Sequence, residues 1–235
     1  GSCNISDSEL RSDPESRLAF GISASDCVID IRNSSLKLGA VSGTVAVVSQ
    51  EGRVDVRSST VESSSTSEFI YLLRAENSEL NLRDTSMKTG RSPDVIGLES
   101  RDSDVSMRDS MLQLSNRSVR VRGILLERGG ILDLIENEIV FSDFSADDDV
   151  GRSVVKDGTG RSGSIAGNYA AVEQKAESDL LMRSNRFSGV ETLLINPDGT
   201  RFDSVEELEK ERPPFDVKNP HSGNRVVPMG EPDLR

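Results

Sequence analysis

The stretch Ile29–Leu38 reads IDIRNSSLKL, and its pattern recurs five more times along the chain. The copies are Val54–Ser63 (VDVRSSTVES), Leu80–Thr89 (LNLRDTSMKT), Val105–Leu114 (VSMRDSMLQL), Leu132–Phe141 (LDLIENEIVF) and Leu180–Gly189 (LLMRSNRFSG). Their first residues are separated by 25, 26, 25, 27 and 48 positions, and the last gap is close to two periods. Repeats of about 20–50 residues build solenoids, in which each unit stacks on the next. The repeat therefore predicts one continuous coil.

Each copy reads as two short strands joined by a polar bend. Positions one and three are apolar and position two is usually polar, which is the alternation of a strand with one buried face. Position six carries a short polar side chain that suits a tight bend and can hydrogen-bond from repeat to repeat, and position eight is apolar again. The residues at position six are Ser34, Ser59, Thr85, Ser110, Asn137 and Asn185.

A third apolar stretch precedes each copy, at residues 19–22, 44–48, 69–73, 95–98, 123–126 and 169–172. Three short strands per turn, about 25 residues per turn and small polar corners resemble a right-handed parallel β-helix, the architecture of pectate lyases, tail-spike proteins and many bacterial surface proteins. The resemblance covers residues 18–190 and concerns the fold alone, because no family motif accompanies it. We therefore expect an all-β fold, a right-handed single-stranded parallel β-helix of about six rungs.

A leucine-rich repeat is the alternative, because Leu132–Ile139 matches its L-x-L-x-x-N-x-L core. Such repeats place another apolar residue three positions before the first leucine, whereas this chain has polar residues or glycine there. The half of the repeat that is usually helical reads here as strands and turns. These differences favour the β-helix. The upstream residues are Asp26, Glu51, Asn77, Asp102, Gly129 and Glu177.

The chain divides into three predicted parts. Residues 1–17 are expected to cover the N-terminal end of the coil, because open sheet edges need covers. Residues 18–190 form the coil, with an insertion at about 142–168, and residues 191–235 form a C-terminal cap and a Pro-rich tail. The cap is predicted as a short helix over 203–210 with Ser204 as N-cap, followed by an extended tail.

Composition excludes several classes of partner. The formal net charge of −12 argues against nucleic acid and against anionic lipid, because both are bound mainly through Lys and Arg. No stretch approaches the roughly 18–20 apolar residues of a transmembrane helix. The two cysteines leave three readings open: two free thiols, a disulfide between Cys3 and Cys27, or a lipidated Cys3 of a bacterial lipoprotein. The oligomeric state is not indicated.

Position four of the repeat is arginine in every copy except the fifth, where it is Ile135. Strand alternation places this position outward, beside the partly acidic position two, so stacked turns should show an arginine column next to an acidic column. One reading is a solvated ladder of ion pairs. The other is a ridge that binds an acidic glycan or a partner's carboxylates, because arginine binds carboxylates in a bidentate manner. The candidate binding residues are Arg57, Arg83, Arg108 and Arg183.

The insertion contains a cluster of carboxylates. Calcium prefers oxygen ligands, so a Ca²⁺ site is one interpretation of this loop, although its spacing matches no calcium-binding loop and acidic loops are usually only solvated. No other cofactor is indicated. The candidate metal ligands are Asp143, Asp147, Asp148 and Asp149.

Catalytic signatures of β-helix enzymes are not evident. The polygalacturonase-like set of paired aspartates, His-Gly and Arg-x-Lys has no counterpart, and the one histidine, His221, lies in the Pro-rich tail. Sugar-binding grooves usually stack rings on aromatics, but this chain has no Trp, and Tyr71 and Tyr169 lie on strands predicted to face inward. A lyase that uses Ca²⁺ and arginine is not excluded by these residues.

We therefore expect a non-catalytic β-helical structural or binding module, secreted or at a bacterial cell envelope, that binds a glycan or a surface protein. The alternative is a polysaccharide lyase or glycoside hydrolase that acts on an acidic polysaccharide. A third interpretation is a segment of a longer β-helical adhesin. A deep groove with two or three carboxylates within reach of an arginine would favour the enzyme.

Overall fold

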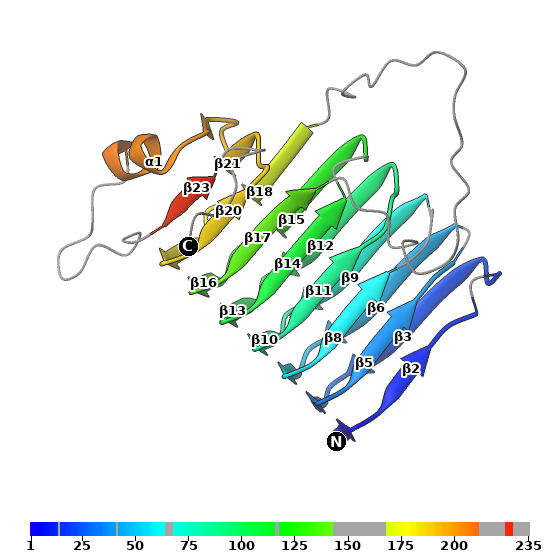
Figure 1. The fold of residues 1–235 in the computed structure, drawn as a ribbon. Helices are drawn as coiled ribbons and strands as arrows, with labels where there is room; N and C mark the ends of the chain where they lie inside the picture. Colours follow the sequence, from blue (N-terminus) through cyan, green and yellow to red (C-terminus); the bar gives the residue numbers. More distant parts are fainter. Residues whose placement is uncertain are drawn as a thin grey trace, which may run out of the picture.

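The chain folds into a parallel β-solenoid of about six turns, which confirms the predicted fold class. The computed structural model describes residues 1–13, 15–40, 42–63, 68–115, 118–142, 168–211 and 224–227. Each turn contributes one strand to each of three sheets, which we name A, B and C, and successive turns stack in register from one end of the coil to the other (Figure 1).

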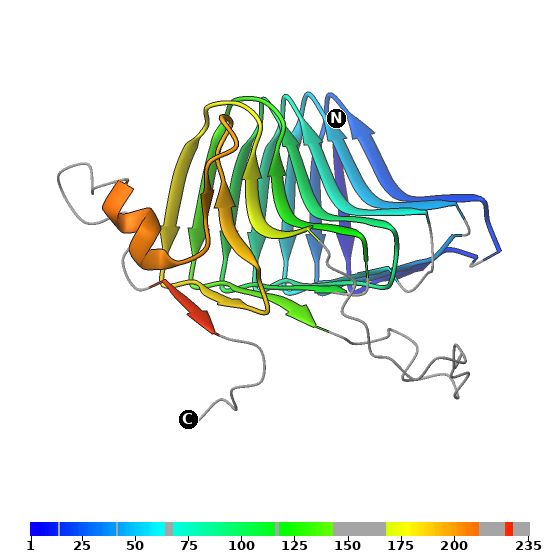
Figure 2. The ribbon, with the colours of Figure 1, turned by 90° about the horizontal axis from the view of Figure 1, so that it is seen from above.

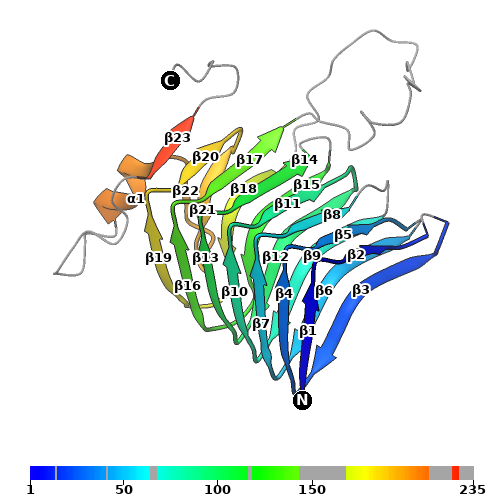
Figure 3. The same ribbon diagram turned by 60° about the horizontal axis from the view of Figure 1, so that its bottom comes forward.

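Sheet A consists of the first strand of each turn, and its members lie side by side in Figure 3. They are β1 (Ser2–Ser6), β4 (Val28–Arg32), β7 (Arg53–Arg57), β10 (Glu79–Arg83), β13 (Asp104–Arg108), β16 (Ile131–Ile135) and β19 (Asp179–Arg183). Sheet B follows the polar bend. Its members are β2 (Glu9–Arg11), β5 (Ser35–Leu38), β8 (Thr60–Ser63), β11 (Ser86–Thr89), β14 (Met111–Ser115), β17 (Glu138–Ser142), β20 (Arg186–Ser188) and β23 (Arg225–Val227).

Sheet C closes each turn with longer strands, and these strands bend along their length (Figure 2). They are β3 (Leu18–Ser25), β6 (Gly43–Gln50), β9 (Phe69–Glu76), β12 (Asp94–Arg101), β15 (Arg120–Leu126), β18 (Asn168–Gln174), β21 (Thr192–Ile195) and the antiparallel β22 (Arg201–Phe202). In the sequence, the predicted insertion falls after β17 of sheet B and before β18 of sheet C.

The core is a column of aliphatic side chains enclosed by the three sheets. Positions one, three and eight of the repeat point into it, as the alternation predicted, and residues such as Leu80, Leu82 and Met87 are buried. Burying an aliphatic side chain of this size stabilises the fold by roughly 1.5–3 kcal/mol before entropy is counted. Each turn supplies only a few such side chains, so the coil depends on contact between neighbouring turns.

The two ends of the coil differ. The segment predicted as the N-terminal cover, 1–17, contains strands β1 and β2, which pair with β4 and β5 in register. The opposite end has the predicted helix, α1 (Val205–Glu211), beside the last turn (Figure 1). Ser204 accepts a hydrogen bond from the Glu207 amide at 3.2 Å, as an N-cap does, and Glu207 accepts one from the amide of the preceding Asp203 at 2.9 Å.

Part of the predicted extended tail is a strand. Residues Arg225–Val227 form β23, which pairs in parallel with β20 at the edge of sheet B. The residue before it, Asn224, accepts a hydrogen bond from the Asn185 amide at 2.9 Å and donates one to the Met182 carbonyl at 2.9 Å. The chain therefore adds one more strand to sheet B after α1, where the composition had indicated only a tail.

Candidate functional site: an arginine-lined depression on sheet A

The outer face of sheet A displays the arginine column that the repeat predicted. Strand register places Arg32, Arg57, Arg83 and Arg108 beside one another in consecutive turns. In-register parallel strands lie about 4.7–4.9 Å apart, so the guanidinium groups are carried at that interval along the coil. Ile135 occupies the next turn and Arg183 the turn after that.

Three of the predicted binding residues surround a shallow depression of about 370 Å³ on this face. The fourth, Arg183, does not line it, because Ile135 separates Arg183 from Arg108 in the column. The depression contains four arginines against two carboxylates, so it is locally positive on a protein of net charge −12. Its lining residues are Arg53, Asp55, Arg57, Glu79, Asn81, Leu82, Arg83, Ser106 and Arg108.

Asp55 organises the acidic side of the depression. Its carboxylate accepts hydrogen bonds from Nε of Arg53 at 3.1 and 3.2 Å and from Nδ2 of Asn81 at 3.0 Å. The carboxylate also raises the pKa of Arg53, through this hydrogen bond and through its charge. Arg53 is thus paired with Asp55, and a carboxylate oxygen of Glu79 lies 3.7 Å from Nη1 of Arg53.

Arg57 and Arg83 have the weakest ion-pair contacts of the four arginines in the depression. Arg57 approaches Asp55 only to 3.9 Å and Arg83 approaches Asp84 only to 3.7 Å. Neither guanidinium makes a hydrogen bond to the residues that the structure describes, and the side chains of Arg57 and Arg83 are 46% and 66% exposed. Exposed ion pairs of this kind contribute about 0–1 kcal/mol, so an incoming anion displaces little.

The outer face of sheet A lacks aromatic side chains in the part of the chain that the structure describes. A ligand is therefore held there by charge and hydrogen bonds and not by ring stacking. Arginine is the side chain best suited to this, because its planar guanidinium forms paired hydrogen bonds to carboxylate, sulfate or phosphate groups.

A second polar cluster on the outer face of sheet C was not predicted from the sequence. Glu99 has only 3% of its side chain exposed and lies 2.8 Å from Nη2 of Arg101 and 3.5 Å from Nε of Arg74. Arg122 is similarly buried and pairs with Glu173 of the next turn. Arg74, Glu99 and Glu173 share one register position of sheet C, but Val48 and Leu125 hold it in other turns, so no repeated charge pattern signals the cluster in the sequence.

Tyr71 lies on this same outer face, which corrects the prediction that both tyrosines face inward. Its ring packs edge-on against Phe69, with centroids 5.6 Å apart. The pKa of Tyr71 is raised mainly by burial, and further by the negative charges of Asp94 and Glu99. Tyr169 does face inward, against Phe141, and donates a hydrogen bond to the Ser118 carbonyl at 3.3 Å. Ile70 and Leu72 on either side of Tyr71 are buried in the core, so strand alternation turns Tyr71 outward.

The remaining predicted sites are placed as follows. The candidate calcium ligands Asp143, Asp147, Asp148 and Asp149 lie outside the described residues. Within the described ranges, no group of three or more His, Cys, Asp or Glu side chains is positioned to hold a metal ion. Both cysteines are free thiols. None of the described helices has the length and apolar character to cross a membrane.

Comparison with known proteins adds no relative to this picture. No protein-family model, no curated protein and no solved structure matches the chain. The coil and the geometry on its faces are therefore the basis for the functional proposal.

Proposed function

We propose that the protein is a non-catalytic binding module that holds an acidic carbohydrate on the outer face of sheet A. The observation that carries this proposal is the pair Arg57 and Arg83, adjacent in register, exposed and without hydrogen bonds to other described residues, inside a depression with excess positive charge. Binding an anionic group supplies the hydrogen bonds that these guanidinium groups lack.

An acidic carbohydrate suits this face better than other anions. The overall charge of −12 opposes the long-range attraction of any polyanion, so binding depends on contacts inside the depression. Nucleic acids are disfavoured most, because their affinity comes largely from phosphate electrostatics. The ligand envisaged carries carboxylate or sulfate groups at intervals, as many surface polysaccharides do. The same proposal places the protein outside the cell or at a bacterial cell envelope, and fractionation of cells that produce the full-length precursor tests that location.

The proposal is tested by calorimetric titration with uronic acid oligosaccharides. The Arg57→Ala/Arg83→Ala variant is expected to bind at least about tenfold more weakly, because hydrogen bonds to charged groups are worth about 1.5–3 kcal/mol. Arg11→Ala is the matched control, since Arg11 is equally exposed but lies on sheet B beside Glu9. Wild-type protein that binds no acidic oligosaccharide, or a double variant that binds as well as Arg11→Ala, would contradict the proposal.

Cleavage of an acidic polysaccharide is the second candidate, and one observation favours it. The Glu99 carboxylate is buried on the outer face of sheet C between two arginines, and Tyr71 lies nearby. The same titration samples can be assayed for new reducing ends and for unsaturated sugar products. Product formation that is lost in Glu99→Gln would replace the binding proposal by an enzymatic one.

A further inference from the structure

We propose that the arginine-lined depression selects ligands by length. A linear polyanion lies along the coil axis, with one anionic group at each of Arg57, Arg83 and Arg108. Further anionic groups add no affinity. This inference rests on the proposed function and adds to it the orientation and the footprint of the ligand. Three positions spaced by about 4.8 Å span roughly 10 Å between the first and the third.

The footprint ends on one side at Arg32. The Asp30 carboxylate accepts a hydrogen bond from Nε of Arg32 at 2.8 Å and a second bond from Nη2, so one edge of this guanidinium is already paired on its own strand. The Arg32 hydrogen bond also lowers the pKa of Asp30, which keeps the pair ionised. Arg32 does not line the depression, although strand register places it directly beside Arg57.

The footprint ends on the other side at Ile135. In that turn an aliphatic side chain replaces the arginine. Asp133 accepts one hydrogen bond, from Nη2 of Arg108 at 2.7 Å, whereas Asp30 holds two nitrogens of Arg32, so Arg108 lines the depression with its other nitrogens not hydrogen-bonded to described residues. The neighbouring Ile131 is 46% exposed, so the face beyond Arg108 turns apolar and acidic. An anionic group placed there would lose hydration without gaining a partner.

The charges within the depression also set the direction of the ligand. Along the strands, Asp55 lies between Arg53 and Arg57, and Glu79 begins the next strand, so a polyanion laid along a strand would approach a carboxylate. Along the coil axis the ligand meets an arginine in each of three turns. The axial direction is the one in which every contact is between opposite charges.

The interval between turns favours a glycan over an acidic peptide. In an extended peptide, side chains on the same side repeat every two residues, about 6.6–6.8 Å apart, so two intervals would miss the arginine spacing by roughly 4 Å. A linear uronic acid chain carries one carboxylate on every ring, and rotation about its glycosidic bonds can bring successive carboxylates to the side that faces the arginines at an interval of one sugar. We therefore commit to a polysaccharide with an anionic group on each sugar.

The test uses the full chain and uronic acid oligomers from dimer to hexamer. We expect affinity to rise up to the trimer and then to level off, apart from the statistical factor for extra binding registers. Ile135→Arg fills the gap in the arginine column between Arg108 and Arg183. It should raise the affinity for the pentamer and hexamer about tenfold and leave the affinity for the trimer unchanged. Ile131→Arg is the matched control, because it adds the same charge to the same strand outside the column.

The outcomes separate this inference from the proposed function. If wild-type protein binds no oligomer of any length, the proposed function fails and this inference fails with it. Three results would overturn this inference and leave the binding of acidic ligands intact. They are affinity that keeps rising beyond the trimer, an equal increase in affinity from Ile135→Arg and Ile131→Arg, and polyglutamate that binds as tightly as the uronic acid chain. Loss of affinity in Arg83→Ala but not in Arg32→Ala would support both.

Discussion

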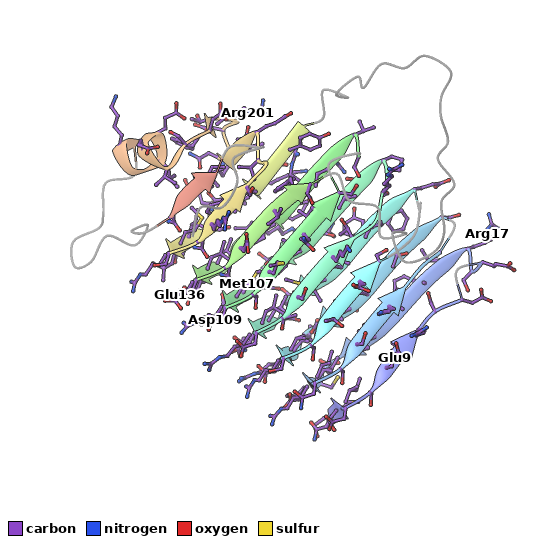
Figure 4. The ribbon with its side chains drawn as sticks, in the orientation of Figure 1. Glu9, Arg17, Met107, Asp109, Glu136 and Arg201 are labelled. Atoms are coloured by element: carbon purple, nitrogen blue, oxygen red, sulfur yellow. The ribbon has the colours of Figure 1, made fainter. Side chains whose placement is uncertain are left out.

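The corners of the coil require backbone conformations that most residues avoid. The residue after each sheet A strand has a positive φ, near 50°, although it is not glycine, and Figure 4 shows Asp109 and Glu136 at this corner. The left-handed conformation costs about 1–2 kcal/mol for such residues. Bonds between turns offset the cost: the Asp84 amide, for example, donates to the Arg108 carbonyl at 3.2 Å. The residues of this corner are Asp7, Asn33, Ser58, Asp84, Asp109, Glu136 and Ser184.

The buried polar ladder inside this corner is the residue-scale feature that stabilises the stacking. Asn137 is 2% exposed, accepts from the Ser110 amide at 3.0 Å and donates to the Met107 carbonyl at 2.7 Å and to Asn185 at 3.0 Å. Asn137→Ala leaves these groups buried without partners, each at about 1–3 kcal/mol. We expect the free energy of unfolding, measured by chemical denaturation, to fall by about 2–4 kcal/mol.

Asn4→Ala is the control for that substitution, because Asn4 is an exposed asparagine on β1. Its effect should stay within about 0.5 kcal/mol, as is usual at exposed surface positions. Equal destabilisation by the two substitutions would show that the ladder contributes no more than an ordinary surface asparagine.

At the scale of the element, glycine permits close stacking within sheet C. A Cβ added at Gly123 would lie 2.5 Å from the Ala171 carbonyl oxygen of the next turn, and one at Gly97 would lie 2.6 Å from the Gly123 carbonyl oxygen. Both glycines lie at the point in the long strands where the residue-by-residue pairing with the next turn skips one position. The bend of sheet C therefore depends on backbone contact between turns.

Gly123→Ala is expected to destabilise the coil by about 1–3 kcal/mol, because overpacking forces the backbones of β15 and β18 apart. Gly129→Ala is the matched control, since its nearest neighbours would be 3.9 and 4.0 Å from the new Cβ. Thermal unfolding followed by circular dichroism measures both. A melting temperature of Gly123→Ala as high as that of Gly129→Ala would mean that the strands separate without cost.

The whole molecule carries a large acidic excess, with 40 carboxylates against 28 basic side chains, on a narrow coil. Many outward carboxylates are paired with arginines within a turn or between turns, as in Asp30–Arg32, Arg108–Asp133 and Arg186–Glu138. These pairs limit the repulsion between like charges that stacking would otherwise bring together at one turn's spacing. The interruption of the arginine column also acts at this scale, because it limits the binding face to part of the coil.

The stability of the whole coil should fall at alkaline pH through its two tyrosines. Burial raises the pKa of both Tyr71 and Tyr169 above the ordinary value of 10.0. The unfolded chain therefore releases these protons first as the pH rises, so the tyrosines cost no stability below about pH 10 and reduce it progressively above that.

Denaturation curves between about pH 9 and pH 11 measure this effect, and the Tyr71→Phe/Tyr169→Phe variant provides the reference. The wild-type chain is expected to lose more stability over this interval than the variant, although the variant starts lower because it lacks the bond to the Ser118 carbonyl. If the two proteins lose the same stability over this pH interval, the tyrosines are not the cause of the alkaline destabilisation.

Features set by the repeat were predicted correctly because they are local. The inward apolar positions, the polar ladder and the arginine column each follow from strand alternation within one ten-residue copy. The ladder position of Asn224 was missed because α1 and a long connection separate it from the last copy. A signal was present in retrospect, since Gly223–Val227 (GNRVV) resembles Ser184–Ser188 (SNRFS).

The amino-acid sequence alone was sufficient for the stacked coil, for the outward arginine column and for its break at Ile135, because each depends on periodicity and on the two faces of a strand. The tertiary structure was needed to show that Asp30 accepts hydrogen bonds from Arg32 while Arg57 and Arg83 make none to described residues, since pairing depends on side-chain conformation, which the repeat does not specify. It was equally needed to show which alternate residues of β9 face the core, which leaves Tyr71 outward, and to show that Glu99 is buried between two arginines.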